Sequence, residues 1–205
     1  MTTEGVAVSP GFLESIQPIV LVGGRSRRFG RDKLREPWGD GGRVLVQYPI
    51  DTLRAVFGHR VLLMGECDAA ILPLADGVLT DTHPGIGPIG GILSGLKQRS
   101  GPICVLAGDM PLFRDVELVE LLSTARMHYD ALAILASTDR LHPCAGVYTQ
   151  HARPYLEAGV TRGDHRLHGA LDQNGIITVP VNPEATANVN TLDDLHRRDA
   201  PQHTL

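Results

Sequence analysis

LVGGRSRRFGRDK, the stretch from Leu21 to Lys33, decides how this sequence is expected to fold. It continues an apolar run that begins at Pro18, and an apolar run that meets two glycines predicts a buried strand ending in a tight turn. Four arginines and one lysine follow within the same stretch. Glycines let backbone N–H groups come close to a bulky ligand, and clustered cations attract an anion. The stretch therefore predicts a site for the phosphates of a nucleotide.

The composition limits the classes of protein to which the chain can belong. Its 205 residues are enough for one well-packed domain or two small ones, and its formal net charge of −4 argues against a broad basic surface for nucleic acid. The sequence has no apolar run of membrane-spanning length and no signal pattern at its N-terminus. We therefore expect a cytoplasmic protein with no nucleic-acid and no membrane partner. Cys67, Cys104 and Cys144 are far apart and lack the spacing of metal ligands.

Apolar runs alternate with amphipathic segments along the chain. Strands are expected at 18–22, 60–64, 78–80, 102–107, 131–136, 144–148 and 176–181. Helices are expected at 44–57 (with Pro49 indicating a late start or a bend), 90–98, 115–126 (capped by Asp115), 154–156, 165–172 and from Thr191 onward. This alternation predicts an α/β domain with a mostly parallel sheet and helices on both faces. We expect the domain to span residues 16–198, with loose termini at 1–15 and 199–205.

Polar residues follow three of the expected strands. The Gly23–Lys33 loop follows the first, Asp81 follows the strand at 78–80, and Asp109 follows the strand at 102–107. Ligands of open parallel sheets bind beyond the carboxyl ends of the strands, so these side chains belong to one candidate site. A carboxylate placed like that of Asp109 can hold Mg²⁺ against phosphates, although such an aspartate also serves as a turn or helix cap.

A glycine-rich turn, His83–Gly91, lies between the two aspartates. It brings backbone close to a ligand, or else Gly90 and Gly91 pack a helix tightly on the sheet. Two familiar phosphate motifs are excluded. The residues after Gly30 are not those of a P-loop, and the first two glycines do not begin a G-x-G-x-x-G fingerprint.

The order of these motifs resembles that of the molybdenum cofactor guanylyltransferases, a family of nucleotidyltransferases. The resemblance covers nearly the whole chain, roughly from Ile16 to His196. Its five matching segments are Leu21–Lys33, Gly87–Gly91, Gly108–Pro111, His142-Pro143 with Tyr148, and Asn188–Thr191.

The resemblance implies a single Rossmann-like nucleotidyltransferase domain that transfers GMP from GTP to a molybdopterin-type cofactor and releases pyrophosphate. The N-terminal part would bind the nucleotide and the C-terminal part the pterin. Carried over by position, the guanine and ribose contacts would be Leu21, Val22, Gly23 and Gly24, with Asp81 also at the nucleotide. Lys33 would bind phosphates, Asp109 would hold Mg²⁺, and Asn188 and Asn190 would line the pterin side.

The sequence departs from the family pattern at several positions. Val22 stands where alanine is usual and Phe29 where methionine is usual, and both are tolerable apolar changes. The asparagine that often follows the second strand is absent at Gly65 and Glu66, so the resemblance supplies no side chain for one ribose or base contact. Gly108 replaces a frequent cysteine.

The implied reaction needs electrostatic stabilisation more than acid–base chemistry. A phosphate nucleophile is already anionic, so catalysis depends on positioning and on neutralising charge. We expect Lys33, Asp109 and Arg28 to be the catalytic residues, with Arg25 and Arg31 as further candidates for the triphosphate. Arg27 and Arg31 could instead point to solvent, and Asp32 could pair with an arginine and only brace the loop.

Other functions fit parts of the same pattern. A cytidylyltransferase or a sugar-phosphate nucleotidyltransferase would share the fold, but the related CTP enzymes have Ala-Ala-Gly where this chain has Val22-Gly23-Gly24, which favours guanine. A non-catalytic nucleotide-binding scaffold for cofactor insertion would lack pyrophosphate release. The partners implied are GTP, the molybdopterin-type cofactor, and molybdoenzyme apoproteins or insertion chaperones.

Overall fold

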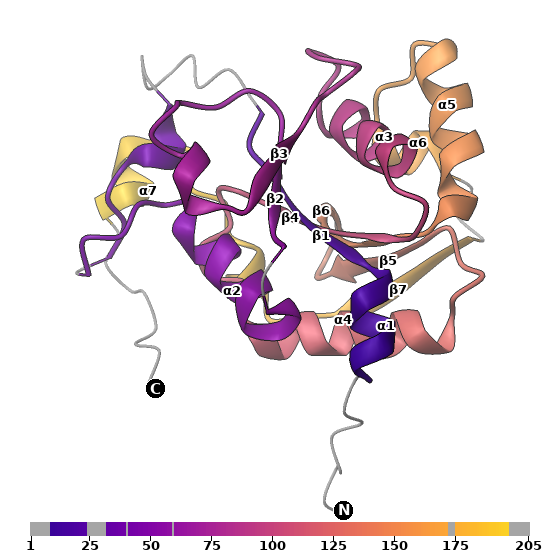
Figure 1. The fold of residues 1–205 in the computed structure, drawn as a ribbon, viewed down its shortest axis with the longest axis horizontal. Coiled ribbons are helices and arrows are strands. Elements are labelled where there is room, and N and C mark those ends of the chain that lie inside the picture. The colour runs from indigo at the N-terminus through magenta and orange to yellow at the C-terminus, as the bar shows by residue number, and fades with distance from the viewer. Residues whose placement is uncertain (1–8, 24–31, 40, 59, 172–174, 197–205) are drawn as a thin grey trace, which may run out of the picture.

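A computed structural model of the chain describes residues 9–23, 32–39, 41–58, 60–171 and 175–196. Its centre is a seven-stranded sheet with the strand order β3-β2-β1-β4-β6-β5-β7 (Figure 1). The strands are β1 (Gln17–Leu21), β2 (Leu62–Met64), β3 (Gly77–Leu79), β4 (Ile103–Ala107), β5 (Ala133–Ser137), β6 (Leu141–Tyr148) and β7 (Ile176–Pro180).

Strand β6 is the one strand of this sheet that runs against the others. The pairs β1–β2, β2–β3, β1–β4 and β5–β7 are parallel, whereas β6 is antiparallel to both of its neighbours, β4 and β5. The mostly parallel sheet predicted from the alternation is therefore confirmed. The carboxyl ends of β1 to β4 lie at one edge, and the beginning of β6 lies at that same edge because Ala145 pairs with Leu106.

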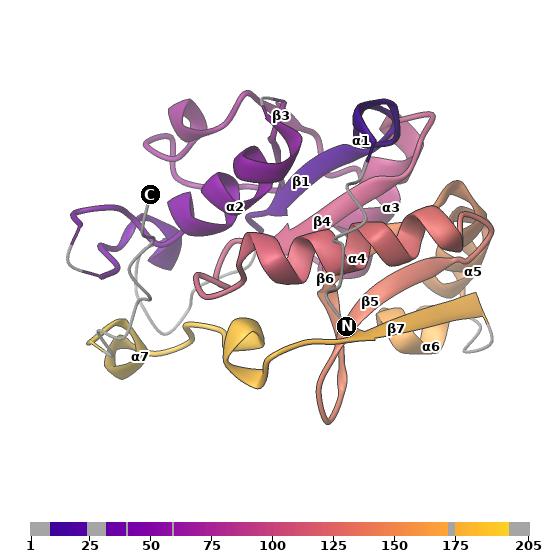
Figure 2. The same ribbon diagram turned by 90° about the horizontal axis from the view of Figure 1, so that it is seen from below.

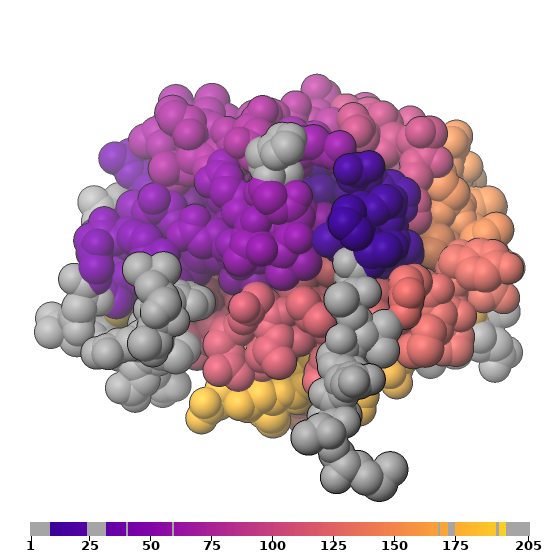
Figure 3. All heavy atoms as spheres, turned by 60° about the horizontal axis from the view of Figure 1, so that its bottom comes forward, coloured from indigo at the N-terminus to yellow at the C-terminus, as the bar shows by residue number. Residues whose placement is uncertain are grey.

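Helices cover both faces of the sheet, as predicted. Alternate residues of β1 point to different cores, with Ile19 in the cluster under α3, α5 and α6 and Val20 in the cluster under α2 and α4 (Figures 1 and 2). In the space-filling view, α1, α2 and α4 close over the second face (Figure 3). The helices are α1 (Pro10–Ser15), α2 (Gln47–Phe57), α3 (Pro88–Gln98), α4 (Asp115–Met127), α5 (Arg153–Thr161), α6 (Leu167–Ala170) and α7 (Leu192–His196).

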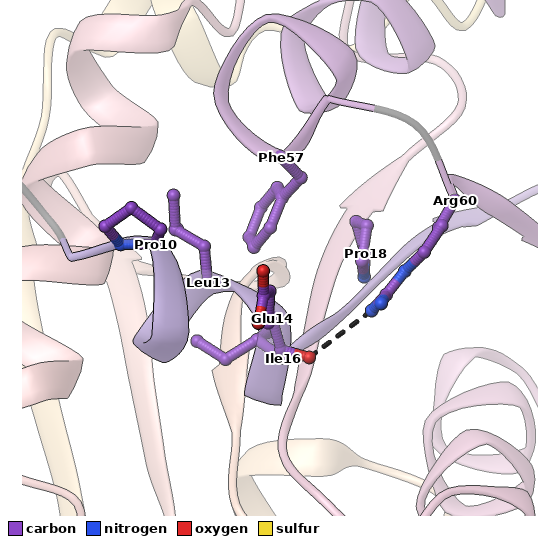
Figure 4. Close-up of a pocket in the computed structure, with 7 residues that line it drawn as sticks. All are labelled: Pro10, Leu13, Glu14, Ile16, Pro18, Phe57 and Arg60. Carbon is purple, nitrogen blue, oxygen red and sulfur yellow. Dashed lines mark hydrogen bonds between the residues drawn. The ribbon is translucent and has the colours of Figure 1, made fainter.

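The N-terminal end of the described chain is more ordered than the sequence suggested. Residues 10–15, expected within a loose terminus, form α1, whose Phe12 and Leu13 pack against the core. A hollow of about 260 Å³ separates this helix from the end of α2 (Figure 4). Arg60 bridges the hollow by donating to the Glu14 carbonyl at 3.3 Å. The hollow lies at the amino end of β1, at the edge opposite to the carboxyl ends of the strands.

The late start predicted for α2 is confirmed, and other helix limits correct the sequence predictions. Helix α2 begins at Gln47, so Pro49 falls in the first turn, where its missing N–H removes no intrahelical bond. Asp115 was predicted to cap α4, but Arg114 is the cap residue and Asp115 is the first helical one. The Arg114 backbone N–H donates to the Glu117 carboxylate at 3.2 Å, as the cap residue does in a capping box. The helix therefore begins one residue earlier than an Asp115 cap would place it. Near the C-terminus, α5 is longer and α6 shorter than predicted.

Glycines allow α3 to lie directly on the sheet. A Cβ on Gly91 would stand 3.1 Å from Met64 Cγ, and one on Gly90 would stand 2.4 Å from the carbonyl oxygen of His83. Gly91 therefore packs the helix on the sheet as one interpretation predicted, Gly90 packs it on the preceding turn, and approach of this backbone to a ligand stays a prediction. This packing fixes the glycine-rich turn before α3 against the carboxyl edge of the sheet.

Among the described residues, no helix combines the length and the apolar character that crossing a bilayer requires.

Candidate active site

Lys33 and Asp109 form an ion pair at the carboxyl edge of the sheet. Asp109 lies just beyond β4, and Lys33 begins a 3₁₀ turn, Lys33–Arg35. The Lys33 Nζ lies 2.6 Å from Asp109 Oδ2, and the two side chains are only 16% and 18% exposed. The residues are 76 positions apart in the sequence. Their contact is what we expect if the polar residues that follow the parallel strands form one site beyond the carboxyl ends.

The segment Asn188–Asn190 completes this cluster from the other end of the chain. Lys33 Nζ also donates to the Val189 carbonyl at 2.8 Å and to Asn190 Oδ1 at 3.3 Å. The Val189 side chain is buried in the core, whereas its two asparagine neighbours are exposed. Asn190 is therefore brought to the ion pair, and Asn188 is exposed on the same short segment.

All three hydrogens of the Lys33 ammonium group have acceptors. An ammonium group has three donors and no acceptor, and here they are directed at Asp109, Val189 and Asn190. A phosphate oxygen must therefore replace one of these three acceptors before it can bind Lys33. The exchange keeps the ammonium group hydrogen-bonded throughout.

A side-chain contact next to the ion pair sets where the turn lies. Leu34 is buried in the core, and a Cβ on Gly108 would stand 3.1 Å from Leu34 Cδ1 and from the Leu21 carbonyl oxygen. Gly108 also donates its N–H to that carbonyl at 2.9 Å. Because Gly108 has no side chain, the Leu34 side chain can pack against it. Asp109, which follows Gly108, and Lys33, which precedes Leu34, then lie in contact.

Two glycines from different strands meet at the end of β1. Gly65 has a φ of 115°, and a Cβ on it would stand 2.8 Å from the backbone nitrogen of Gly23. Gly65 follows β2, and Gly23 is exposed at the end of β1. The contact requires glycine at position 65, and the two glycines leave backbone without side chains at the carboxyl edge of the sheet.

Val22 contributes backbone rather than a side chain to this edge. Val22 is 2% exposed and lies in the core, and its N–H donates to the Met64 carbonyl at 2.9 Å. The Leu21 side chain packs against α3, where a Cβ on Gly91 would meet its Cδ2 at 3.2 Å. A nucleotide contact predicted for Val22 would have to use the main chain, whereas the Leu21 side chain is only partly buried.

Asp81 lies at the same edge but braces a turn. Its Oδ1 accepts from the His83 N–H at 2.8 Å and from the Ser94 hydroxyl at 3.1 Å. Ser94 is fully buried in α3 and also accepts from the Thr82 N–H at 2.9 Å. Strand β2 stands between β3, which Asp81 follows, and β1. The ion-pair cluster formed by the described residues does not include Asp81, and its nucleotide contact stays a prediction.

Two predicted site residues, Gly24 and Arg28, lie outside the described residues, as do Arg25 and Arg31. Asp32 accepts two backbone N–H groups, and its predicted pairing with a loop arginine stays a prediction because those arginines lie outside the described residues. Its Oδ1 bonds Leu34 at 3.1 Å and its Oδ2 bonds Asp68 at 3.0 Å.

Asp109 is the carboxylate of this cluster that can hold a metal ion. In the described part of the chain, no three His, Cys, Asp or Glu side chains gather as a metal site. Mg²⁺ does not need such a cage, because it keeps several waters and is bound by one or two carboxylates together with substrate phosphates. Asp109 already attracts one cation, the Lys33 ammonium group, so its donor chemistry fits the ion.

The start of β6 contributes a thiol and an imidazole near this edge. Burial raises the pKa of the Cys144 thiol to about 12, and the negative charge of Asp109 adds to the rise. Burial, followed by the charge of Arg140, lowers the pKa of His142, whose Nε2 lies 2.8 Å from the Thr138 hydroxyl. At neutral pH both groups are therefore uncharged, and neither supplies a cation to the site.

Sequence reasoning missed the Val189 carbonyl and the Asp68 N–H. Both are backbone groups, so their residue types carry no signal. The one available sign was position, because Gly65 and Asp68 follow an expected strand whose carboxyl end belongs to the site edge.

The fold and the ion pair together define a class, the α/β domains that bind an anionic ligand beyond the carboxyl ends of a parallel sheet. The family described as "MobA-like NTP transferase domain" matches residues 18–177, and the chain belongs to this family.

Curated relatives and solved structures agree with this assignment. The chain is 31% identical over 192 residues to a "Probable molybdenum cofactor guanylyltransferase" of Chloroflexus aggregans, covering 86% of this chain and 90% of the relative. A relative of the same name in Aquifex aeolicus is 28% identical, covering 87% of each chain.

The fold is shared more widely. The solved structure of "Molybdopterin-guanine dinucleotide biosynthesis protein A" from Archaeoglobus fulgidus has a TM-score of 0.71 at 24% identity, over 89% of this chain and 96% of that one. A "4-diphosphocytidyl-2C-methyl-D-erythritolsynthase" from Anaerococcus prevotii has a TM-score of 0.64 at 15% identity, over 92% and 96%. At these identities the structures establish the fold alone.

Proposed function

We propose that this protein transfers GMP from GTP to a molybdopterin-type molybdenum cofactor, with release of pyrophosphate and formation of the guanine dinucleotide cofactor. The observation that carries the proposal is the Lys33–Asp109 pair, 2.6 Å apart at the carboxyl edge of the sheet. The names of the curated relatives agree with it. The product would pass to molybdoenzyme apoproteins or to the chaperones that insert the cofactor.

The chemistry is a displacement at the α-phosphorus of GTP. An oxygen of the terminal phosphate of the pterin forms a bond to that phosphorus, and the bond from the phosphorus to the bridging oxygen of the β-phosphate breaks. Pyrophosphate leaves with the electron pair of the broken bond. The nucleophile is already an anion, so no side chain needs to take its proton. The protein must instead align two anions and neutralise the leaving group.

Lys33 is the cation that the described structure offers for this task. As an oxygen of the triphosphate approaches, it can replace the Asn190 oxygen, whose contact at 3.3 Å is the longest of the three. Lys33 would then hold the leaving pyrophosphate while it stays tied to the backbone at Val189. Asp109 would hold Mg²⁺, which supplies charge neutralisation to the phosphates when bound.

Backbone at the end of β1 is proposed to receive the guanine base. Gly23 and Gly65 leave a bare strip of main chain there, and main-chain N–H and C=O groups can distinguish the edges of a purine from those of a pyrimidine. Asn190, which contacts Lys33, and the exposed Asn188 beside it in sequence are proposed to face the pterin.

A cytidylyltransferase is the second candidate, since the fold is shared with a protein so named. The test is pyrophosphate release by the full chain with Mg²⁺ and the molybdopterin cofactor, comparing GTP with CTP. We expect GTP to be preferred and a guanine dinucleotide to be detected by mass. A preference for CTP would replace the proposal, and GTP binding without pyrophosphate release would favour the non-catalytic scaffold.

Asp109→Asn tests the proposed metal ligand within the same assay. We expect the variant to fold and to lose about a hundredfold in turnover, since one well-placed electrostatic group contributes about 3 kcal/mol to a barrier. Asp76→Asn is the matched control because the Asp76 carboxylate, like that of Asp109, pairs with a cation, but at the opposite edge of the sheet. Undiminished release by Asp109→Asn would remove Asp109 from the metal role.

A further inference from the structure

Asp32 joins the turn that carries Lys33 to the loop that follows β2. Its Oδ1 accepts the Leu34 N–H at 3.1 Å, within the turn, and its Oδ2 accepts the Asp68 N–H at 3.0 Å, across to the loop. The two oxygens of one carboxylate thus span two segments 36 positions apart in sequence. Backbone bonds also tie this turn to residues 45 and 46, where the Val46 N–H donates to the Leu34 carbonyl at 3.1 Å. The Asp32 carboxylate adds the link to the loop that follows β2.

The loop on the far side is itself held to the end of β1. Gly65 packs against Gly23 so closely that a Cβ would overlap its backbone, and Asp68 Oδ1 accepts the Ala70 N–H at 2.9 Å. A second link runs from Asp68 to Arg35 at 2.6 Å, but these side chains are 29% and 47% exposed, so solvent screens it. Both links are charge-assisted, but the one through Asp32 joins a half-buried carboxylate to a fixed backbone N–H, whereas the Arg35 link depends on an exposed, flexible side chain.

We propose that Asp32 is a positioning residue that sets the distance between the base-binding backbone at Gly23–Gly65 and the phosphate-binding ammonium group of Lys33. The inference rests on the proposed binding of GTP. The Lys33 side chain is long and flexible, so its reach is defined only if its backbone is fixed. The Leu34 contact with Gly108 holds the turn against β4, and Asp32 links the same turn to the loop that contains Gly65. The effect on a ligand should therefore grow with the number of its phosphates.

The direction in which GTP affinity changes in Asp32→Asn distinguishes a positioning role of Asp32 from a simple effect of its charge. Removing a carboxylate near an anionic ligand reduces repulsion, so charge alone predicts that Asp32→Asn binds GTP more tightly. Loss of the link to Asp68 predicts the opposite. The asparagine oxygen can keep the Leu34 bond, but its NH₂ group cannot accept from Asp68.

The matched control is Asp68→Asn. It removes an equal charge from the other end of the same link but keeps the backbone N–H that Asp32 uses. If charge governed affinity, both asparagine variants would behave alike. If Asp32 positions Lys33, they will differ.

The experiment titrates GTP, GMP and guanosine into the wild-type protein, Asp32→Asn, Asp32→Ala and Asp68→Asn, with the melting temperature measured for each. We expect Asp32→Asn to bind GTP about tenfold more weakly, equivalent to about 1.4 kcal/mol, and Asp32→Ala to lose more. In Asp32→Asn, the affinity for guanosine should change by less than about twofold, and the loss of affinity for GMP should be intermediate. Asp68→Asn should bind GTP at least as tightly as the wild type, because removing a negative charge reduces repulsion of the ligand.

Three outcomes would overturn the inference. These are unchanged or tighter GTP binding by Asp32→Asn, an equal loss for GTP and guanosine, and an equal weakening of GTP binding by Asp68→Asn. A wild-type protein that does not bind GTP would instead overturn the proposed function, so the two failures are distinguishable.

Discussion

The backbone N–H of Val189 donates a hydrogen bond to the carbonyl oxygen of Asp109, at 2.9 Å. The Val189 carbonyl in turn accepts from Lys33. One residue from late in the chain therefore holds both members of the ion pair, through groups that every non-proline residue possesses. The last segment of the domain is thus part of the site even without a ligand, and the site is assembled from three distant parts of the sequence.

Lys33→Met should reduce turnover about a hundredfold, since it removes about 3 kcal/mol of electrostatic stabilisation from the transition state. It also leaves Asp109, which is only 18% exposed, without its cation. The measurement is the steady-state rate of pyrophosphate release. Lys97→Met is the control, because Lys97 pairs with Glu157 at 3.4 Å on the surface. Equal rates in the two variants would exclude Lys33 from the reaction.

Asn190→Ala should lower kcat/KM for the transfer about tenfold, as expected for the loss of a hydrogen bond worth about 1.4 kcal/mol in the complex. It should leave the melting temperature nearly unchanged. Its side chain is exposed, and the cap of α7 is made by Thr191 and Asp194 rather than by Asn190 Oδ1. Asn182→Ala should do the reverse, because Asn182 Oδ1 caps the turn Pro183–Thr186. A melting temperature lowered as much in Asn190→Ala as in Asn182→Ala would contradict this assignment.

Gly65→Ala should abolish GTP binding, because its new Cβ would displace the backbone of Gly23. Gly58→Ala is the control, since Gly58 also has a positive φ, 76°, but open space around it. Both variants should lose about 1 to 2 kcal/mol of stability to backbone strain. Isothermal titration with GTP and urea unfolding separate the two effects. Tight GTP binding by Gly65→Ala would show that the strip at Gly23 does not receive the base.

His142→Gln should flatten the dependence of stability on pH between about 7 and 5. In the folded protein, burial and then Arg140 lower the pKa of His142, with Asp139 opposing them. The unfolded chain therefore binds the proton first as the pH falls below about 6.5, and the wild-type protein loses stability there. Above that pH the residue contributes nothing to the dependence. Urea unfolding at pH 7.5 and 5.5 measures the difference, and identical slopes for the two proteins would refute it.

The architecture could be predicted largely because its signals are local. Buried strands such as Ile103–Ala107 are continuous apolar runs, and α4 has a regular stripe at Leu118, Leu121 and Leu122. The alternation of strands and helices along the chain then favours parallel pairing of the strands. The meeting of Lys33 and Asp109 followed from the rule that places ligands at the carboxyl edge, together with the family resemblance.

The direction of a strand and the hydrogen bonds made by backbone groups could not be predicted. The reversal of β6 leaves no mark on its own residues, since Ala145–Tyr148 would be equally apolar in either direction. The short turn that joins it to β5 was the one available sign, because a parallel pair needs a long crossover. The second bond of Asp32 was invisible for another reason, since any residue at position 68 except proline supplies the same N–H group.

Because β6 runs against its neighbours, the turn that precedes it lies at the edge of the sheet that carries Asp109, and this turn can change separately from the strands. The tip at Thr138–Arg140 joins β5 to β6 at the same edge as Asp109. Lengthening, shortening or recharging that tip changes the surface at this edge, while the pairing of Ala133 with Tyr148 keeps its register. The tip can therefore vary without disturbing the strands that carry the ion pair.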